Sequence, residues 1–142
     1  MRLGRDSGMP LAPIDRALQL ARSALGTTSP NPSVGCVLTD AAGRTLGEGH
    51  TQRAGGPHAE VMALRDAAAR GHDVRGATAW VTLEPCSHQG RTGPCCEALA
   101  AAGIRKVVAS IADPNPLVAG QGFARLRAAG IEVEVGPGAD DA

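Results

Sequence analysis

Four side chains of this sequence have types and spacings that could hold a metal ion and move protons beside it. His58 and Glu60 stand in the stretch PHAE, and Cys86 and Cys95 each follow a proline in the stretch LEPCSHQGRTGPC. Imidazole nitrogen and thiolate sulfur are ligands that zinc prefers, and three such ligands leave a tetrahedral ion one open position for water. The pattern therefore indicates a catalytic zinc site held by His58, Cys86 and Cys95.

Glu60 is expected to carry protons at this site and not to bind the metal. One residue separates it from His58, so on a helix the two side chains point in different directions. Zinc acidifies a bound water, and a neighbouring carboxylate can take that proton and later give it to a leaving group. This is the chemistry that releases ammonia from an amino-bearing carbon. Zinc nucleobase deaminases carry the pattern H-x-E…P-C-x-x-C, from which this sequence departs by having eight residues between its two cysteines.

The remaining cysteines leave alternatives open. Cys96 is the best rival to Cys95, because one step in register would exchange them, and Cys95 is preferred because it follows Pro94 where a helix opens. Cys36 lies in the middle of a predicted strand and is expected to be a small core residue, as is Cys96. The N-terminus lacks the apolar segment of a signal peptide. We therefore expect a cytoplasmic protein with reduced thiols, which argues against disulfides.

The elements that must position these residues alternate between helix and strand. Apolar residues at helical spacing predict helices over 13–25, 58–71, 94–103 and 123–130. Buried or β-branched runs predict strands over 33–40, 44–51, 77–83, 104–111 and 131–135. The first two strands form a predicted hairpin, and the whole order predicts an α/β sheet with helices on both faces. In such a sheet the ends of strands meet the starts of helices at one edge, where ligands bind.

Composition narrows the class of molecule. The 142 residues fit one domain with its own core, 14 Lys and Arg balance 14 Asp and Glu, and the chain has one Trp, one Phe and no Tyr. Nucleic-acid-binding proteins usually show a basic surplus and base-stacking aromatics, so we expect no nucleic-acid partner. No apolar run reaches the roughly 20 residues that span a bilayer, so we expect no membrane partner.

Four stretches, TTSPNPSVGCVL, HAEVMAL, VTLEPCSHQGRTGPC and DPNPLVAGQGFARLRAAGIEV, follow one another in this order. Together they resemble the deaminase domain of the bacterial bifunctional riboflavin-biosynthesis deaminase/reductase, over about residues 13–136, and the cysteine spacing is that family's own. The resemblance implies a three-layer α/β/α cytidine-deaminase-like fold with a mixed five-stranded sheet. It also implies Zn²⁺, held by the ligands named above, and hydrolytic removal of the 2-amino group from 2,5-diamino-6-ribosylamino-4(3H)-pyrimidinone 5′-phosphate.

The resemblance also implies substrate contacts. Asn31, in the P-N-P loop, resembles the residue that grips the pyrimidine, and an amide offers both a donor and an acceptor to a ring edge. His88 and Arg91, between the two cysteines, resemble ribose-phosphate contacts, and the guanidinium fork suits phosphate. Asp113 and Asn115 resemble further substrate contacts, although Asp and Asn also favour turns in their own right.

Three departures from the family pattern bear on the function. In GEGHT, His50 stands one position before the usual aromatic-His pair, TGPC replaces T-P-P-C, and no reductase region follows before Ala142. We expect a single deaminase domain over 1–142 that acts on a phosphorylated aminopyrimidine as a homo-oligomer, a dimer or larger. A separate reductase would serve the same pathway, unless the sequence is truncated. The alternatives are a free-standing paralogue acting on another amino-heterocycle or guanidine-like compound, a nucleic-acid deaminase, and a non-enzymatic zinc module.

Overall fold

The computed structural model describes residues 12–23, 34–50, 58–83, 95–111 and 120–136. Helices and strands follow one another in the predicted order. The helices are α2 (Pro13–Ser23), α3 (Ala59–Ala69), α4 (Cys95–Ala101) and α5 (Gln121–Ala128). The strands are β1 (Gly35–Thr39), β2 (Thr45–His50), β3 (Thr78–Val81), β4 (Lys106–Ala109) and β5 (Glu132–Val135). None of the described helices is long and apolar enough to cross a membrane.

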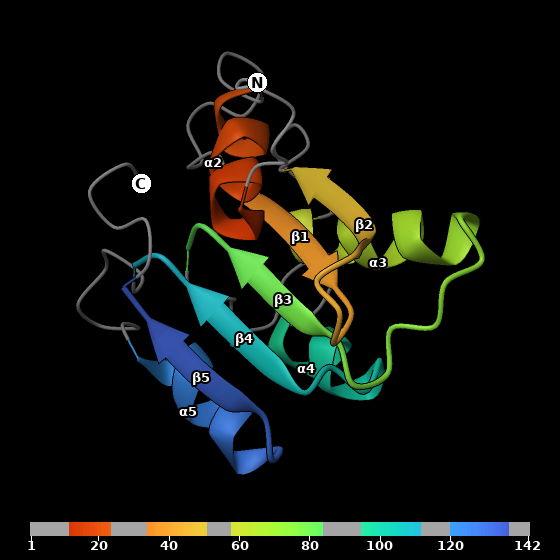
Figure 1. Ribbon diagram of the computed structural model, residues 1–142. Helices are drawn as coiled ribbons and strands as arrows, with labels where there is room; N and C mark the ends of the chain where they lie inside the picture. The colour runs from red at the N-terminus through yellow and green to blue at the C-terminus, as the bar shows by residue number, and fades with distance from the viewer. Residues whose placement is uncertain (1–11, 24–33, 51–57, 84–94, 112–119, 137–142) are drawn as a thin grey trace.

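The five strands form one mixed sheet in the order β2-β1-β3-β4-β5. β1 runs antiparallel to both of its neighbours, whereas β3, β4 and β5 are parallel to one another. The carboxyl ends of β2, β3, β4 and β5 therefore lie at one edge of the sheet (Figure 1). Because α3 follows β2 and α4 follows β3, the first residues of both helices lie at this edge. The mixed five-stranded sheet confirms the predicted fold class.

The two faces of the sheet are covered by different helices, as predicted (Figure 1). On one face α2 packs over the sheet, where Ala17 and Leu20 contact Val37 and the half-buried Trp80. On the other face lie α3, α4 and α5, over the larger core. That core is formed by residues of the strands and of these three helices, and it includes Cys36, Leu38, Ala63, Val81, Cys96, Leu99, Val107, Phe123 and Leu126. Side chains alternate between the two faces along each strand, which explains why Cys36 and Val37 belong to different layers.

The predicted element boundaries differ from the observed ones at the helix starts. The helix predicted over 58–71 begins at Ala59, and His58 is its N-cap, with an extended backbone at φ −75° and ψ 165°. The helix predicted over 94–103 is shorter, and Cys95 is its first residue. α5 begins before the predicted residue 123, directly after Gly120, whose φ of 86° suits a residue without a side chain. These shifts leave His58 at the N-cap of α3 and Cys95 at the first position of α4.

Candidate active site

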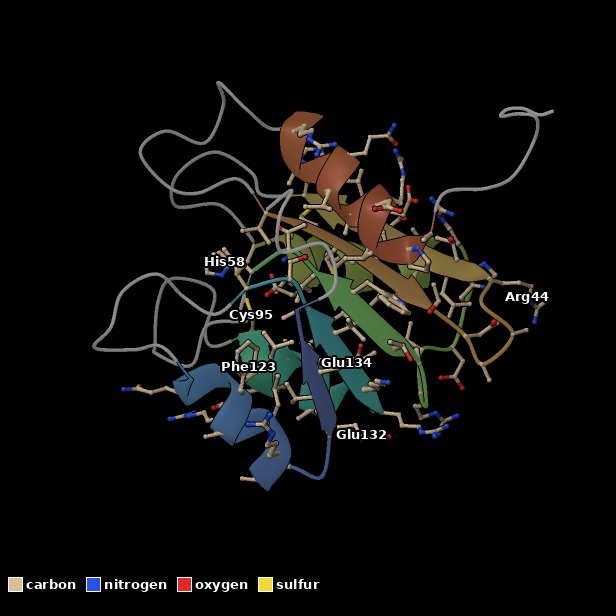
Figure 2. All side chains as sticks on the ribbon, turned by 60° about the vertical axis from the view of Figure 1, so that its left-hand side comes forward. Arg44, His58, Cys95, Phe123, Glu132 and Glu134 are labelled. Atoms are coloured by element: carbon tan, nitrogen blue, oxygen red, sulfur yellow. The ribbon has the colours of Figure 1, made fainter. Side chains whose placement is uncertain are left out.

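His58 and Cys95 lie against each other at the carboxyl edge of the sheet. The Nδ1 atom of His58 is 3.0 Å from the Sγ atom of Cys95, although 37 residues separate them in the chain. Figure 2 shows the two side chains together where α3 and α4 begin. The sulfur is fully buried, whereas His58 is exposed. The pair therefore connects the buried core to the surface at this edge of the sheet.

The donor set and its geometry fit a zinc ion. Zinc binds histidine nitrogen at about 2.0–2.1 Å and thiolate sulfur at about 2.3 Å, so two such ligands of a tetrahedral ion lie about 3.5 Å apart. The observed separation of 3.0 Å is shorter than this. An opening of about half an ångström between the two helix starts would admit the ion. One imidazole and one thiol are the ligand types that zinc prefers.

The described residues do not test the predicted metal site as a whole. Within the described ranges no three His, Cys, Asp or Glu side chains converge as a metal site, so Glu60 does not complete one with His58 and Cys95 there. Cys86, the third predicted ligand, lies outside the described residues. So do all of the predicted substrate contacts, which are Asn31, His88, Arg91, Asp113 and Asn115.

The two adjacent cysteines point to different places. Cys95 faces His58, whereas the thiol of Cys96 donates to the backbone carbonyl of Gly122 at 3.4 Å and belongs to the main core. One residue turns a helix by about 100°, which is enough to separate the two directions. No disulfide joins Cys36, Cys95 or Cys96 to another described residue. Cys96 is thus a core residue as predicted, and Cys95 is the neighbour of the histidine.

Glu60 is a buried carboxyl group in the first turn of α3, with 4% of its surface exposed. It lies close enough to Cys36 to influence it: burial raises the pKa of the Cys36 thiol well above its ordinary value, and the negative charge of Glu60 raises it further. Cys36 is fully buried in the middle of β1. Glu60 therefore lies in the protein interior, where it is shielded from bulk water.

The structure confirms the prediction that Cys36 is a core residue, but the sequence did not indicate that Cys36 lies near Glu60. That proximity arises because α3 packs across β1 and β2, and no local pattern encodes the contact. The sequence analysis also did not single out Ser110, which directly follows β4 at the carboxyl edge of the sheet. Its Oγ atom is buried and has no hydrogen-bond partner among the described residues. A buried hydroxyl of this kind is usually satisfied by a water or a ligand.

Residues 12–111 match the cytidine and deoxycytidylate deaminase zinc-binding region. The chain belongs to this family. Membership confirms the predicted family resemblance and, at the level of the family, zinc as the metal. The matched residues include both His58 and Cys95, so the contact between them lies within the zinc-binding region of the family.

Individual members of the deaminase family give closer comparisons. The chain is 61% identical to the riboflavin biosynthesis protein RibD of Escherichia coli over 121 residues, which are 85% of this chain and 32% of that protein. It is 46% identical to the diaminohydroxyphosphoribosylamino-pyrimidine deaminase of Buchnera aphidicola, covering 85% of this chain and 80% of that protein.

A solved structure supports the fold directly. RibD of Acinetobacter baumannii superimposes with a TM-score of 0.84 at 52% identity, covering 90% of this chain and 35% of that one. The chain spans about a third of the length of these two RibD relatives.

Proposed function

We propose that this chain is a zinc-dependent hydrolytic deaminase of riboflavin biosynthesis. Its proposed reaction removes the 2-amino group from 2,5-diamino-6-ribosylamino-4(3H)-pyrimidinone 5′-phosphate. The observation that carries the proposal is the 46% identity to a diaminohydroxyphosphoribosylamino-pyrimidine deaminase over 80% of that protein's length. Because the shared region makes up most of that relative, the activity in its name is expected to reside in the region that the two chains share.

The metal would be held by His58, Cys86 and Cys95. The contact between His58 and Cys95 supports two of these ligands, and the spacing of Cys86 supports the third. Zinc, when bound there, acidifies a coordinated water and so supplies a nucleophile near neutral pH. Three protein ligands would fit a catalytic zinc site, since structural zinc sites normally have four.

Glu60 would move the protons of the reaction. Its carboxylate takes a proton from the attacking water and delivers it to the 2-amino nitrogen, which then leaves as ammonia while the ring carbon keeps the water oxygen. Burial of Glu60 supports this role, because a carboxylate shielded from bulk water exchanges protons with the bound reactants. The reaction consumes one water and releases one ammonia, and Glu60 ends as it began.

The substrate would be held by five residues that lie outside the described parts of the chain. We assign the pyrimidine to Asn31, the ribose phosphate to His88 and Arg91, and further contacts to Asp113 and Asn115. The order of these residues in the family pattern supports the assignment. An arginine fork matches the oxygens of a phosphate, and an amide can both donate to and accept from a pyrimidine edge.

We further propose that residues 1–142 act as one deaminase domain in the cytoplasm, as a homo-oligomer of two or more chains. The product would pass to a reductase of the same pathway. The balanced charge of the chain supports a small-molecule substrate over a nucleic acid, because nucleic-acid affinity depends on an excess of Lys and Arg.

Ammonia release tests the proposal. The zinc-loaded chain is assayed with the phosphorylated diaminopyrimidine, with its dephosphorylated form and with deoxycytidylate. We expect kcat/KM to be highest for the first and about 10- to 100-fold lower without the phosphate, since a charge-assisted contact contributes about 1.5–3 kcal/mol. Equal rates with and without the phosphate would overturn the substrate assignment. Absence of ammonia from all three compounds would overturn the proposed reaction.

A further inference from the structure

Two glycines of the edge strand β2 allow α3 to lie directly on the backbone of the strand. Gly47 and Gly49 are two residues apart, so both face the same side of the sheet. A Cβ atom at Gly49 would lie 2.5 Å from the carbonyl oxygen of Ala59 and 2.5 Å from the backbone nitrogen of Ala63. A Cβ atom at Gly47 would lie 2.5 Å from the carbonyl oxygen of Ala63. The height of α3 over β2 therefore depends on the absence of side chains at these two positions.

Asp66 fixes the position of α3 along the strand. Its Oδ2 atom accepts a hydrogen bond of 2.8 Å from the backbone N–H of Glu48, which lies between the two glycines. Because β2 is an edge strand, this donor would otherwise face solvent or another chain. Asp66 also pairs with Arg70 at 3.0 Å, and the side chain of Glu48 is held by two 2.9 Å contacts from Arg16 of α2.

The placement of α3 determines where His58 stands relative to Cys95. His58 is the N-cap of α3, whereas Cys95 begins α4, which follows the central strand β3. A shift of α3 over β2 would thus move the imidazole and leave the sulfur in place. We propose that Gly49 and Asp66 are positioning residues that set the separation of His58 and Cys95 for the metal. The inference rests on the proposed function, because it takes these two residues as zinc ligands.

The size of the expected effect follows from the packing. To bring a Cβ atom at Gly49 from 2.5 Å to an ordinary contact of 3.4 Å, the first turn of α3 must move by about 0.9 Å. Metal–ligand distances are held within about 0.2 Å. Loss of a residue that orients a metal ligand typically weakens metal binding by about 10- to 100-fold. We expect Gly49→Ala to weaken zinc binding by a factor in this range.

The hydrogen bond of Asp66 gives a second test that does not depend on steric strain. Asp66→Ala removes the acceptor for the Glu48 N–H, whereas Asp66→Asn keeps an acceptor oxygen in place and loses only the charge. Arg70→Ala removes the ion pair and leaves the acceptor. Asp73→Ala is the matched surface control, because Asp73 is an exposed carboxylate that pairs with Arg75 away from this contact.

The experiment measures zinc affinity by competition with a chelator, and ligand geometry from the absorption spectrum of the cobalt-substituted protein. Urea unfolding confirms that each variant is folded. We expect Asp66→Ala to bind zinc about 10-fold more weakly with an altered cobalt spectrum, and Asp66→Asn, Arg70→Ala and Asp73→Ala to stay within a few-fold of wild type.

Two results would overturn the inference while leaving the proposed function intact. One is a folded Asp66→Ala protein that binds zinc as wild type does. The other is an equal loss in Asp66→Ala and Asp66→Asn. A wild-type chain that binds no zinc would instead overturn the proposed function, and the inference with it.

Discussion

Replacing Cys95 and Cys96 separately by alanine should have similar effects on the stability of the metal-free protein, but only Cys95→Ala should remove the stabilisation that zinc adds. The two side chains are adjacent and almost equally buried, at 0% and 2% exposure. Each substitution removes one buried heavy atom, which costs about 1 kcal/mol of folding free energy. Cys96→Ala additionally removes a weak 3.4 Å contact to the carbonyl oxygen of Gly122. Without zinc, the two variants should therefore lie within about 1 kcal/mol of each other.

Zinc separates the two variants because a ligand that binds only the folded state stabilises it. At a free zinc concentration 100 times the Kd, the added stability is about 2.7 kcal/mol. Wild type and Cys96→Ala should both show this increment, since the sulfur beside His58 is retained. Cys95→Ala should lose most or all of it, because that sulfur is the atom 3.0 Å from the imidazole.

The assay is urea unfolding with zinc and with EDTA, followed by the fluorescence of Trp80, the one tryptophan of the chain. Trp80 suits this purpose because its Nε1 atom donates to Thr39 at 2.9 Å on the α2 face, on the side of the sheet opposite to α3 and α4. Retention of the zinc increment in Cys95→Ala, together with its loss in Cys96→Ala, would refute the reasoning and exchange the two residues.

Three further predictions concern a thiol, a hydroxyl and a cation. Burial and Glu60 raise the pKa of the Cys36 thiol in the folded state. In the unfolded chain the thiol ionises at about pH 8.5, so the folded state is favoured fully below that pH and progressively less as the pH rises above it. Wild type should then lose up to about 1.4 kcal/mol per pH unit relative to Cys36→Ala, as urea titrations would measure; parallel curves would contradict this. Ser110→Ala should leave stability unchanged or raise it by up to about 1 kcal/mol, because the hydroxyl has no partner among the described residues; a clear loss in thermal unfolding would show that the hydroxyl is satisfied. Arg91→Ala should lower kcat/KM for the phosphorylated substrate by about 10- to 100-fold and leave zinc content and the dephosphorylated substrate unaffected; an equal effect on both substrates would exclude the phosphate contact.

The elements of the fold could be predicted from the sequence because their signals are local. Helical spacing and β-branched runs fixed nine elements in the right order, including the hairpin of β1 and β2. The predicted helix begins at His58, whereas α3 begins at Ala59 and His58 is its N-cap. The two positions cannot be told apart in the sequence, because the same apolar pattern follows both. The sequence does not predict the order of the strands in the sheet, since pairing between distant strands has no signature in a single sequence.

In the candidate site too, local features could be predicted from the sequence, whereas contacts between separate elements could not. His58, Glu60 and Cys95 were predicted from residue type and spacing, and the contact between His58 and Cys95 is consistent with that prediction. The nearness of Cys36 to Glu60, and the dependence of α3 on Gly49, arise from contacts between separate elements and could not be read from either stretch alone. The assigned metal ligand Cys86 and the substrate contacts lie outside the described residues and stay predictions.

Ammonia release by the Glu60→Gln variant tests the central claim most directly. The amide keeps the shape of the buried side chain and removes its capacity to carry a proton. The account predicts that wild type and variant each bind one zinc ion per chain and unfold at similar urea concentrations. It also predicts that turnover of the phosphorylated diaminopyrimidine falls by about 10²- to 10⁴-fold or more. Near-normal ammonia release from a zinc-loaded Glu60→Gln protein would contradict the proton-transfer role on which the account depends.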